Sequence, residues 1–245
     1  MWKRNTFFGI IVLVFTSFNY STAQDNNVDS SAIRVNRKGK VIVKTGDELY
    51  FGVSPGFSNR TLTQNPGLFS KPLGERENEY GGWFYSFHVG YRAKLHQLAL
   101  LDIGFEYSRN GEFYDTPGDT IYSYKNTYHH IGIPLKVAFQ YGNKLKLHVA
   151  GGFVPKMFLN QTTMETIGTQ FGGVEEVKTK YKEGYNFFNV DAVISLGFRW
   201  QSGRNLGIYV LPEARWQLFN TYGKQSSYIH KSFVLGISAG IFVML

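Results

Sequence analysis

Apolar residues alternate with polar or small residues in eight separate blocks of the chain. In the last block the odd positions from Phe233 to Leu245 are apolar, while the even positions include Gly236, Ser238 and Gly240. A period of two is the spacing of a β-strand that faces two different environments. The blocks span residues 48–57, 83–95, 97–108, 127–141, 144–159, 185–200, 205–219 and 232–245. This pattern predicts an all-β protein.

The connections between the blocks are alternately short and long. The short ones are His96, the pair 142–143 and the segment 201–204; the long ones are 58–82, 109–126, 160–184 and 220–231. Bacterial outer-membrane barrels alternate short periplasmic turns with long outer loops in this way. Only helices and closed barrels satisfy their backbone hydrogen bonds inside a bilayer. We therefore expect residues 45–245 to form an eight-stranded antiparallel up-and-down transmembrane β-barrel in the bacterial outer membrane, with both termini periplasmic.

The beginning of the chain is typical of an exported protein. Lys3 and Arg4 precede an apolar run over residues 7–18 and a small-residue segment that ends at Ala23. This arrangement predicts a signal peptide over residues 1–23. Residues 24–44 would then be a periplasmic extension, in which the basic and β-branched segment 33–44 forms either a small hairpin or a solvated tail.

Composition agrees with a membrane barrel and narrows its chemistry. Aromatic residues make up 17% of the chain, with 16 Tyr and 21 Phe, and such rings supply lipid-facing area and interfacial girdles. The chain has no cysteine, which excludes disulfides and thiolate chemistry. The formal charge of +8 would suggest nucleic acid for a soluble protein. An exported barrel does not meet nucleic acid, so we expect outer-membrane lipid and the phosphates of lipopolysaccharide, or a periplasmic polyanion, as partners. The alternative, which the scattered positions of the basic residues favour, is that they are ordinary solubilising charge.

The strand period also assigns charged side chains to the barrel interior, because a charge on the lipid face costs roughly 2–4 kcal/mol at mid-bilayer. The predicted lumen charge network consists of Arg92, Asp102, Glu106, Asp191, Arg199, Glu213 and Arg215. Counting back from the turns places Asp191 beside Glu213 and Arg215, and Arg92 diagonal to Asp102. Mutual neutralisation favours a structural plug. The alternatives are a gated polar pathway or a carboxylate that acts as an acid or base, and no motif supports either.

Histidines are the remaining candidates for catalysis. His230 and Ser232 are two residues apart, the same-face spacing that a base and a hydroxyl nucleophile would need, and this loosely resembles lipid A deacylase barrels. The acid and the fixed motif of those enzymes are missing, so a chance pairing is favoured. No metal-ligand spacing and no nucleotide loop occur, so we predict no catalytic residue and no cofactor. An outer-leaflet lipid A modifying enzyme, of the deacylase or acyltransferase type, remains the alternative function.

Two of the long connections read as strand extensions around turn signals. Segments 162–171 and 174–181 flank the pair Gly172 and Gly173, and segments 112–114 and 120–124 flank the turn 117–119. The predicted recognition surface on these hairpins comprises Tyr114, Tyr122, Tyr124, Phe171 and Tyr181. The alternative is an interfacial aromatic girdle with solvated tips.

Two strand segments carry a resemblance to a known family. The stretch 131–136, Ile-Gly-Ile-Pro-Leu-Lys, and the stretch 149–152, Val-Ala-Gly-Gly, resemble the small Bacteroidetes outer-membrane barrels of the PorT-like, or outer membrane protein β-barrel domain, family. The resemblance covers residues 47–245 and implies a fold and a membrane, with PorT itself tied to type IX secretion and gliding. No catalytic residues carry over. We therefore expect a non-enzymatic barrel that presents hairpin loops to a partner in the envelope or in a secretion apparatus.

Overall fold

The computed structural model describes residues 33–35, 41–43, 46–64, 79–96, 98–116, 122–168, 173–202, 205–223 and 226–245. The predicted signal peptide and Phe171 lie outside these residues. The chain divides into two units, residues 1–45 and 46–245. In the first unit, β1 (Ile33–Val35) and β2 (Val41–Val43) pair antiparallel, so the segment 33–44 contains the hairpin that was one of its two predicted alternatives.

The second unit consists of strands. They are β3 (Glu48–Gln64), β4 (Glu79–Tyr80), β5 (Gly82–Lys94), β6 (Ala99–Asp115), β7 (Tyr122–Gly132), β8 (Leu135–Gly142), β9 (Leu145–Gly168), β10 (Val174–Tyr181), β11 (Phe188–Gln201), β12 (Leu206–Gln217) and β13 (Tyr228–Met244). Within the described residues, no helix is long and apolar enough to cross a membrane.

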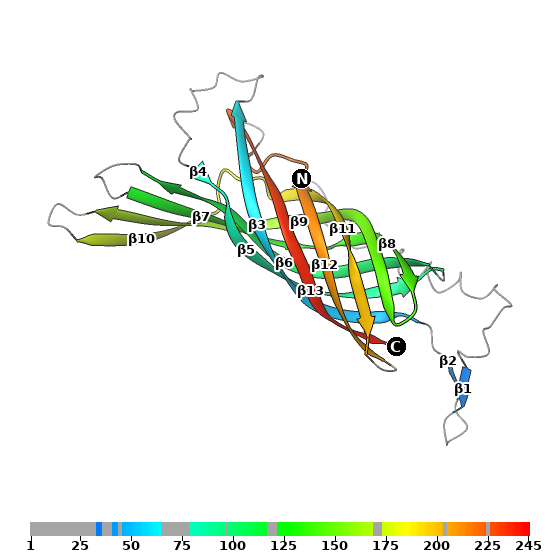
Figure 1. Ribbon diagram of the computed structural model, residues 1–245. Coiled ribbons are helices and arrows are strands. Elements are labelled where there is room, and N and C mark those ends of the chain that lie inside the picture. Colours follow the sequence, from blue (N-terminus) through cyan, green and yellow to red (C-terminus); the bar gives the residue numbers. More distant parts are fainter. Residues whose placement is uncertain are drawn as a thin grey trace. The chain divides into compact units, whose positions relative to one another are not determined.

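Antiparallel pairings close these strands into a ring (Figure 1). The order around the ring is β3, β5, β6, β7 with β8, β9, β11, β12 and β13, and β13 pairs back onto β3. The two pieces β7 and β8 count as one strand, so the described chain forms the predicted eight-stranded barrel. The break between them falls at Ile133 and Pro134, because proline has no N–H for the ladder. The register of β6 with its partner is the same on both sides of the break.

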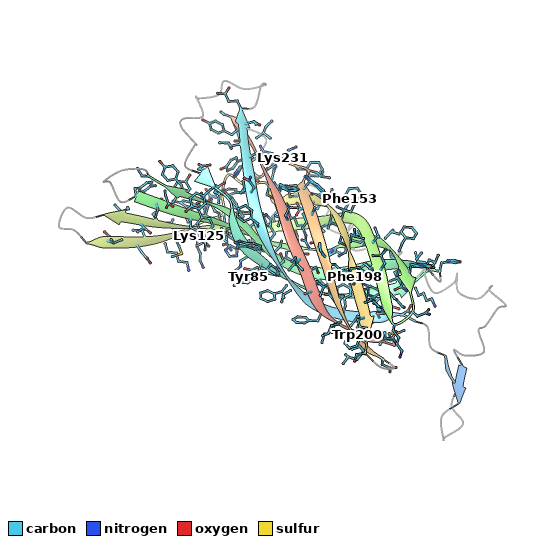
Figure 2. All side chains as sticks on the ribbon, viewed as in Figure 1. Tyr85, Lys125, Phe153, Phe198, Trp200 and Lys231 are labelled. Carbon is cyan, nitrogen blue, oxygen red and sulfur yellow. The ribbon has the colours of Figure 1, made fainter. Side chains whose placement is uncertain are left out.

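The two faces of each barrel strand differ as the period-two pattern predicts. Burial alternates strictly along most of β3, β5, β11 and β12. The labelled side chains Phe153, Phe198 and Trp200 stand on the outside of the ring (Figure 2), where each is about half exposed. Apolar side chains thus cover the exterior and polar ones fill the interior, which is the arrangement of a membrane barrel.

The two ends of the barrel are unlike. The short connections β5–β6, β8–β9 and β11–β12 lie at the same end as the C-terminal residue Leu245, which we call the turn end (Figure 1). At the opposite end, β6, β7, β9 and β10 run on beyond the ring. These continuations, residues 109–115 of β6, 122–129 of β7, 160–168 of β9 and all of β10, together with β4, are called the extension sheet below.

Candidate functional site

The interior of the barrel holds ionic side chains in successive layers, beginning at the turn end. Arg92 donates from Nε to Asp102 Oδ2 over 3.1 Å, and the Tyr50 hydroxyl donates to Asp102 Oδ1 over 2.5 Å. Arg199 forms a salt bridge with Glu48 on the facing strand β3. Arg92 and Asp102 are directly opposite in the β5–β6 register rather than diagonal as predicted, and both are buried.

The middle layer centres on Arg215. Its guanidinium bonds both carboxylate oxygens of Glu106, across the barrel on β6, and the carboxylate of Glu213 on its own strand. Lys136 lies between this middle layer and the layer of Asp102 at the turn end. Its Nζ is 3.8 Å from Asp102 Oδ2 and 4.0 Å from Glu213 Oε2. Each of these charges therefore faces an opposite charge, the condition under which a buried ion is tolerated.

The predicted pairing of Asp191 with Glu213 and Arg215 is wrong. Asp191 instead bonds Lys156 on the neighbouring strand β9, with Nζ 2.6 Å from Oδ1. The error came from the turn: Gln201 pairs with Gly207, so the connection is longer than the four residues assumed. In this register Asp191 lies opposite Gln217, and Arg215 lies opposite Val193.

A further cluster near the extension end escaped the sequence analysis. Arg60 donates to Asn110 Oδ1 over 2.6 Å and lies 3.8 Å from the centre of the Tyr128 ring, while Glu112 Oε2 is 3.0 Å from His230 Nε2. Arg60 had been assigned to a long connection, and Glu112 to a predicted hairpin beyond the barrel without an inward role, whereas β3 and β6 continue through them. The signal was present in the sequence, because both residues keep the inward parity of the strand that precedes them. Glu48 and Lys156 also have the inward parity of predicted blocks.

The His230 and Ser232 pair does not have the geometry of a lipid-facing catalytic site. Both side chains are buried inside the barrel. The Ser232 hydroxyl donates to Gln217 Oε1 over 2.9 Å, and His230 faces Glu112, so the hydroxyl and the imidazole bond other groups. Among the described residues, no group of His, Cys, Asp or Glu is placed to hold a metal ion.

The interior is closely filled. A residual cavity of about 20 Å³ lies between the serines of three strands and the charges of the middle layer. That volume has room for about one water molecule. Its polar lining includes Ser54, Ser86, Ser108, Asp191 and Arg215. The paired charges and the small size of this cavity support a plugged lumen.

The extension sheet joins the two predicted hairpins into one surface. β6 pairs with β7 and β9 with β10, as the turn signals predicted, and β7 also pairs with β9. Figure 1 shows these strands running together away from the ring. β4 adds a short strand along β6, and β10 forms the opposite edge, exposed along nearly all of its length. Two separate loops in the sequence are therefore a single structural element.

The tyrosines of the predicted recognition surface share one face of this sheet. Tyr114 and Tyr124 are stacked with ring centroids 5.0 Å apart, and Tyr122 lies 6.2 Å and 6.3 Å from them. Tyr181 is on the same face by register. The Tyr124 hydroxyl donates to Glu79 Oε1 over 2.6 Å. Desolvation, helped by the Glu165 carboxylate, raises the pKa of the Tyr122 hydroxyl.

A comparison with known structures finds several solved outer-membrane barrels that are similar to this chain. Neisserial surface protein A is 12% identical with a TM-score of 0.36, over 80% of this chain and 97% of that one. OmpT, an outer-membrane protease of Escherichia coli, is 10% identical with a TM-score of 0.42, over 81% and 96%. OprG of Pseudomonas aeruginosa is 8% identical with a TM-score of 0.43, over 82% and 97%. At these values the comparison adds nothing to what the strand pairing shows. No protein-family model and no curated sequence matches the chain.

Proposed function

We propose that this protein is a non-enzymatic outer-membrane barrel whose extension sheet is a contact surface for another protein of the envelope or the exterior. The single observation that carries the proposal is the packed group Tyr114, Tyr122 and Tyr124 on one face of a sheet that stands beyond the barrel. Tyrosines supply large contact area at little entropic cost and are enriched where binding energy concentrates. A filled lumen leaves the extension as the natural place for recognition.

The charge on this face indicates the kind of partner. Glu79 and Glu165 lie in the same cross-strand row as Tyr114 and Tyr124, and Glu175 lies in the row of Tyr122. The lysines of the described extension sheet are on the other face by register. An acidic and aromatic surface suits a protein segment rich in Lys or Arg, since cations bind both carboxylates and tyrosine rings.

The orientation of the barrel in the outer membrane is part of the same proposal. We place the turn end and both termini in the periplasm and the extension sheet outside, because bacterial barrels keep their short turns on the periplasmic side. The partner is then an extracellular or surface protein. The resemblance to PorT-like barrels makes components of the type IX secretion apparatus the first partners to test.

Site-specific crosslinking in intact outer membranes tests this function. A photoreactive amino acid at Tyr122 should give a discrete adduct with one protein, and the adduct should disappear when Tyr114→Ser and Tyr124→Ser are added. The matched control places the same amino acid at Tyr141, an exposed tyrosine at the turn end. The same adducts from both positions, or full complementation of a deletion strain by the Tyr114→Ser, Tyr122→Ser, Tyr124→Ser variant, would contradict the proposal.

A further inference from the structure

The other face of the extension sheet, which continues the outer wall of the barrel, gathers cations. Arg109 on β6 is directly opposite His129 on β7. Lys180 is opposite Thr162, whose hydroxyl is 3.4 Å from His129 Nε2. We call this group the basic wall; its cations are Arg109, Lys125, Lys178 and Lys180, and they surround the imidazole of His129, whose pKa is lowered by desolvation and by the nearby Arg109, Lys180 and Lys178. Lys125 and Lys178 both pair with the same residue of β9, which brings them into one cross-strand row.

The basic wall begins where the apolar exterior ends. Phe105 on β6 is 65% exposed, and Arg109 lies two outward positions further along the same strand. Tyr85 and Tyr107 mark the boundary: the Arg109 guanidinium lies 3.5 Å from the centre of the Tyr85 ring, and the Tyr107 hydroxyl is 2.6 Å from His129 Nδ1. Aromatic girdles occupy the interface between acyl chains and head groups. The basic wall is thus at head-group level.

These cations have no counter-charge within the described chain, in contrast to those of the lumen. None of the four cations forms a salt bridge there, and Arg109 Nε is buried without a hydrogen-bond partner. The nearest acids on this face, Asp115 and Glu176, are in the next row toward the tip, and Asp115 accepts a bond from the Tyr80 hydroxyl. Like charges held together without an anion repel each other. The arrangement is therefore complementary to an anion supplied from outside.

We propose that the basic wall binds the phosphate of a phosphorylated glycolipid head group in the outer leaflet. The lipid source follows from position, because acyl chains can lie on the exposed apolar wall directly below while the head-group phosphates meet the wall at Arg109 on β6 and at Lys180 on β10. A guanidinium presents a planar fork that matches phosphate oxygens, and lysines add point charge. This site is on the opposite face from the tyrosines. It rests on the proposed orientation, which places the extension sheet outside, but not on the protein-binding function.

Native mass spectrometry of the purified barrel in neutral detergent tests the site. The probes are diphosphorylated lipid A and its fully dephosphorylated form. Wild-type protein should retain the phosphorylated form at least tenfold better, and Arg109→Gln with Lys180→Gln should abolish that preference. The matched control replaces two exposed lysines that lie away from the wall, Lys144→Gln with Lys231→Gln. This variant should keep the preference for the phosphorylated lipid. In Figure 2, Lys231 lies on β13, away from Lys125 of the wall.

Three results would overturn the proposal. Wild-type protein that retains both lipids equally has no phosphate site. An unchanged preference in the Arg109→Gln, Lys180→Gln variant would place a site elsewhere. Displacement of the lipid by equimolar inorganic pyrophosphate would show a site for soluble anions instead. Different gel migration of boiled and unboiled samples confirms that each variant is folded, since closed barrels resist detergent.

Discussion

The ammonium of Lys156 and the carboxylate of Asp191 lie 2.6 Å apart inside the barrel, on the neighbouring strands β9 and β11. Both side chains are almost fully buried. Lys156 has no second carboxylate among its salt bridges in the described chain, so this pair stands apart from the shared networks around Arg92 and Arg215. It is the simplest place to test how the lumen is held together.

Removing one member of that pair should destabilise the barrel more than removing both. Asp191→Ala leaves a buried ammonium alone, which typically costs about 3–5 kcal/mol, whereas an apolar replacement of both charges is often neutral. We expect Asp191→Ala to unfold at lower urea concentration than wild type, and Lys156→Met with Asp191→Leu to recover most of the loss. Urea titrations of the protein in lipid vesicles measure both. Equal destabilisation of the single and double variants would refute the pairing argument.

The purified barrel should not conduct ions. An eight-stranded barrel encloses only enough room for side chains, and here the residual cavity holds about one water. Planar bilayers containing the protein should show no steady current steps, under conditions in which a porin does. Reproducible steps of one size from a folded sample would instead establish an open pathway through the charge network.

The proposed orientation can be tested with single cysteines, because the chain has no cysteine of its own. Val174→Cys is near the tip of the extension sheet, and Asn143→Cys is in a short connection at the turn end. A membrane-impermeant maleimide should label Val174→Cys on intact cells, and Asn143→Cys only after the outer membrane is permeabilised. The reverse pattern would invert the barrel and move the contact surface to the periplasm.

Shortening the extension sheet should separate its role from that of the barrel. Met164 and Lys178 are paired, so Asn-Gly in place of residues 165–177 closes the hairpin with a two-residue turn. The shortened protein should keep its heat-dependent gel shift and its preference for phosphorylated lipid, since Arg109, His129 and Lys180 remain. It should fail to complement a deletion strain, because Glu165 and Glu175 are lost and Tyr122 and Tyr124 lose the part of β9 that pairs with them. Complementation at the wild-type level would assign the function to another part of the molecule.

Local patterns determined much of this structure. Alternation with a period of two is a property of the chain itself, because successive side chains of a strand point to opposite sides. It identified the barrel strands, the inward position of residues such as Asp102 and Arg199, and the outward position of residues such as Trp83. The short and long connections likewise indicated the order of hairpins, and the glycine and proline turn signals located the strands of the extension sheet.

The partners of those residues were decided by the tertiary structure alone. Glu48 and Arg199 come from facing strands, β3 and β11, so their contact depends on closure of the ring. Asp191 bonds Lys156 because the β11–β12 turn is longer than the sequence suggested. A bulge in β9 opposite His129 shifts the register and inverts the parity beyond it, so the lysines gather on one face of the extension sheet and the tyrosines on the other. Side-chain direction is a local property, whereas register and closure are set by all the turns and bulges of the barrel together.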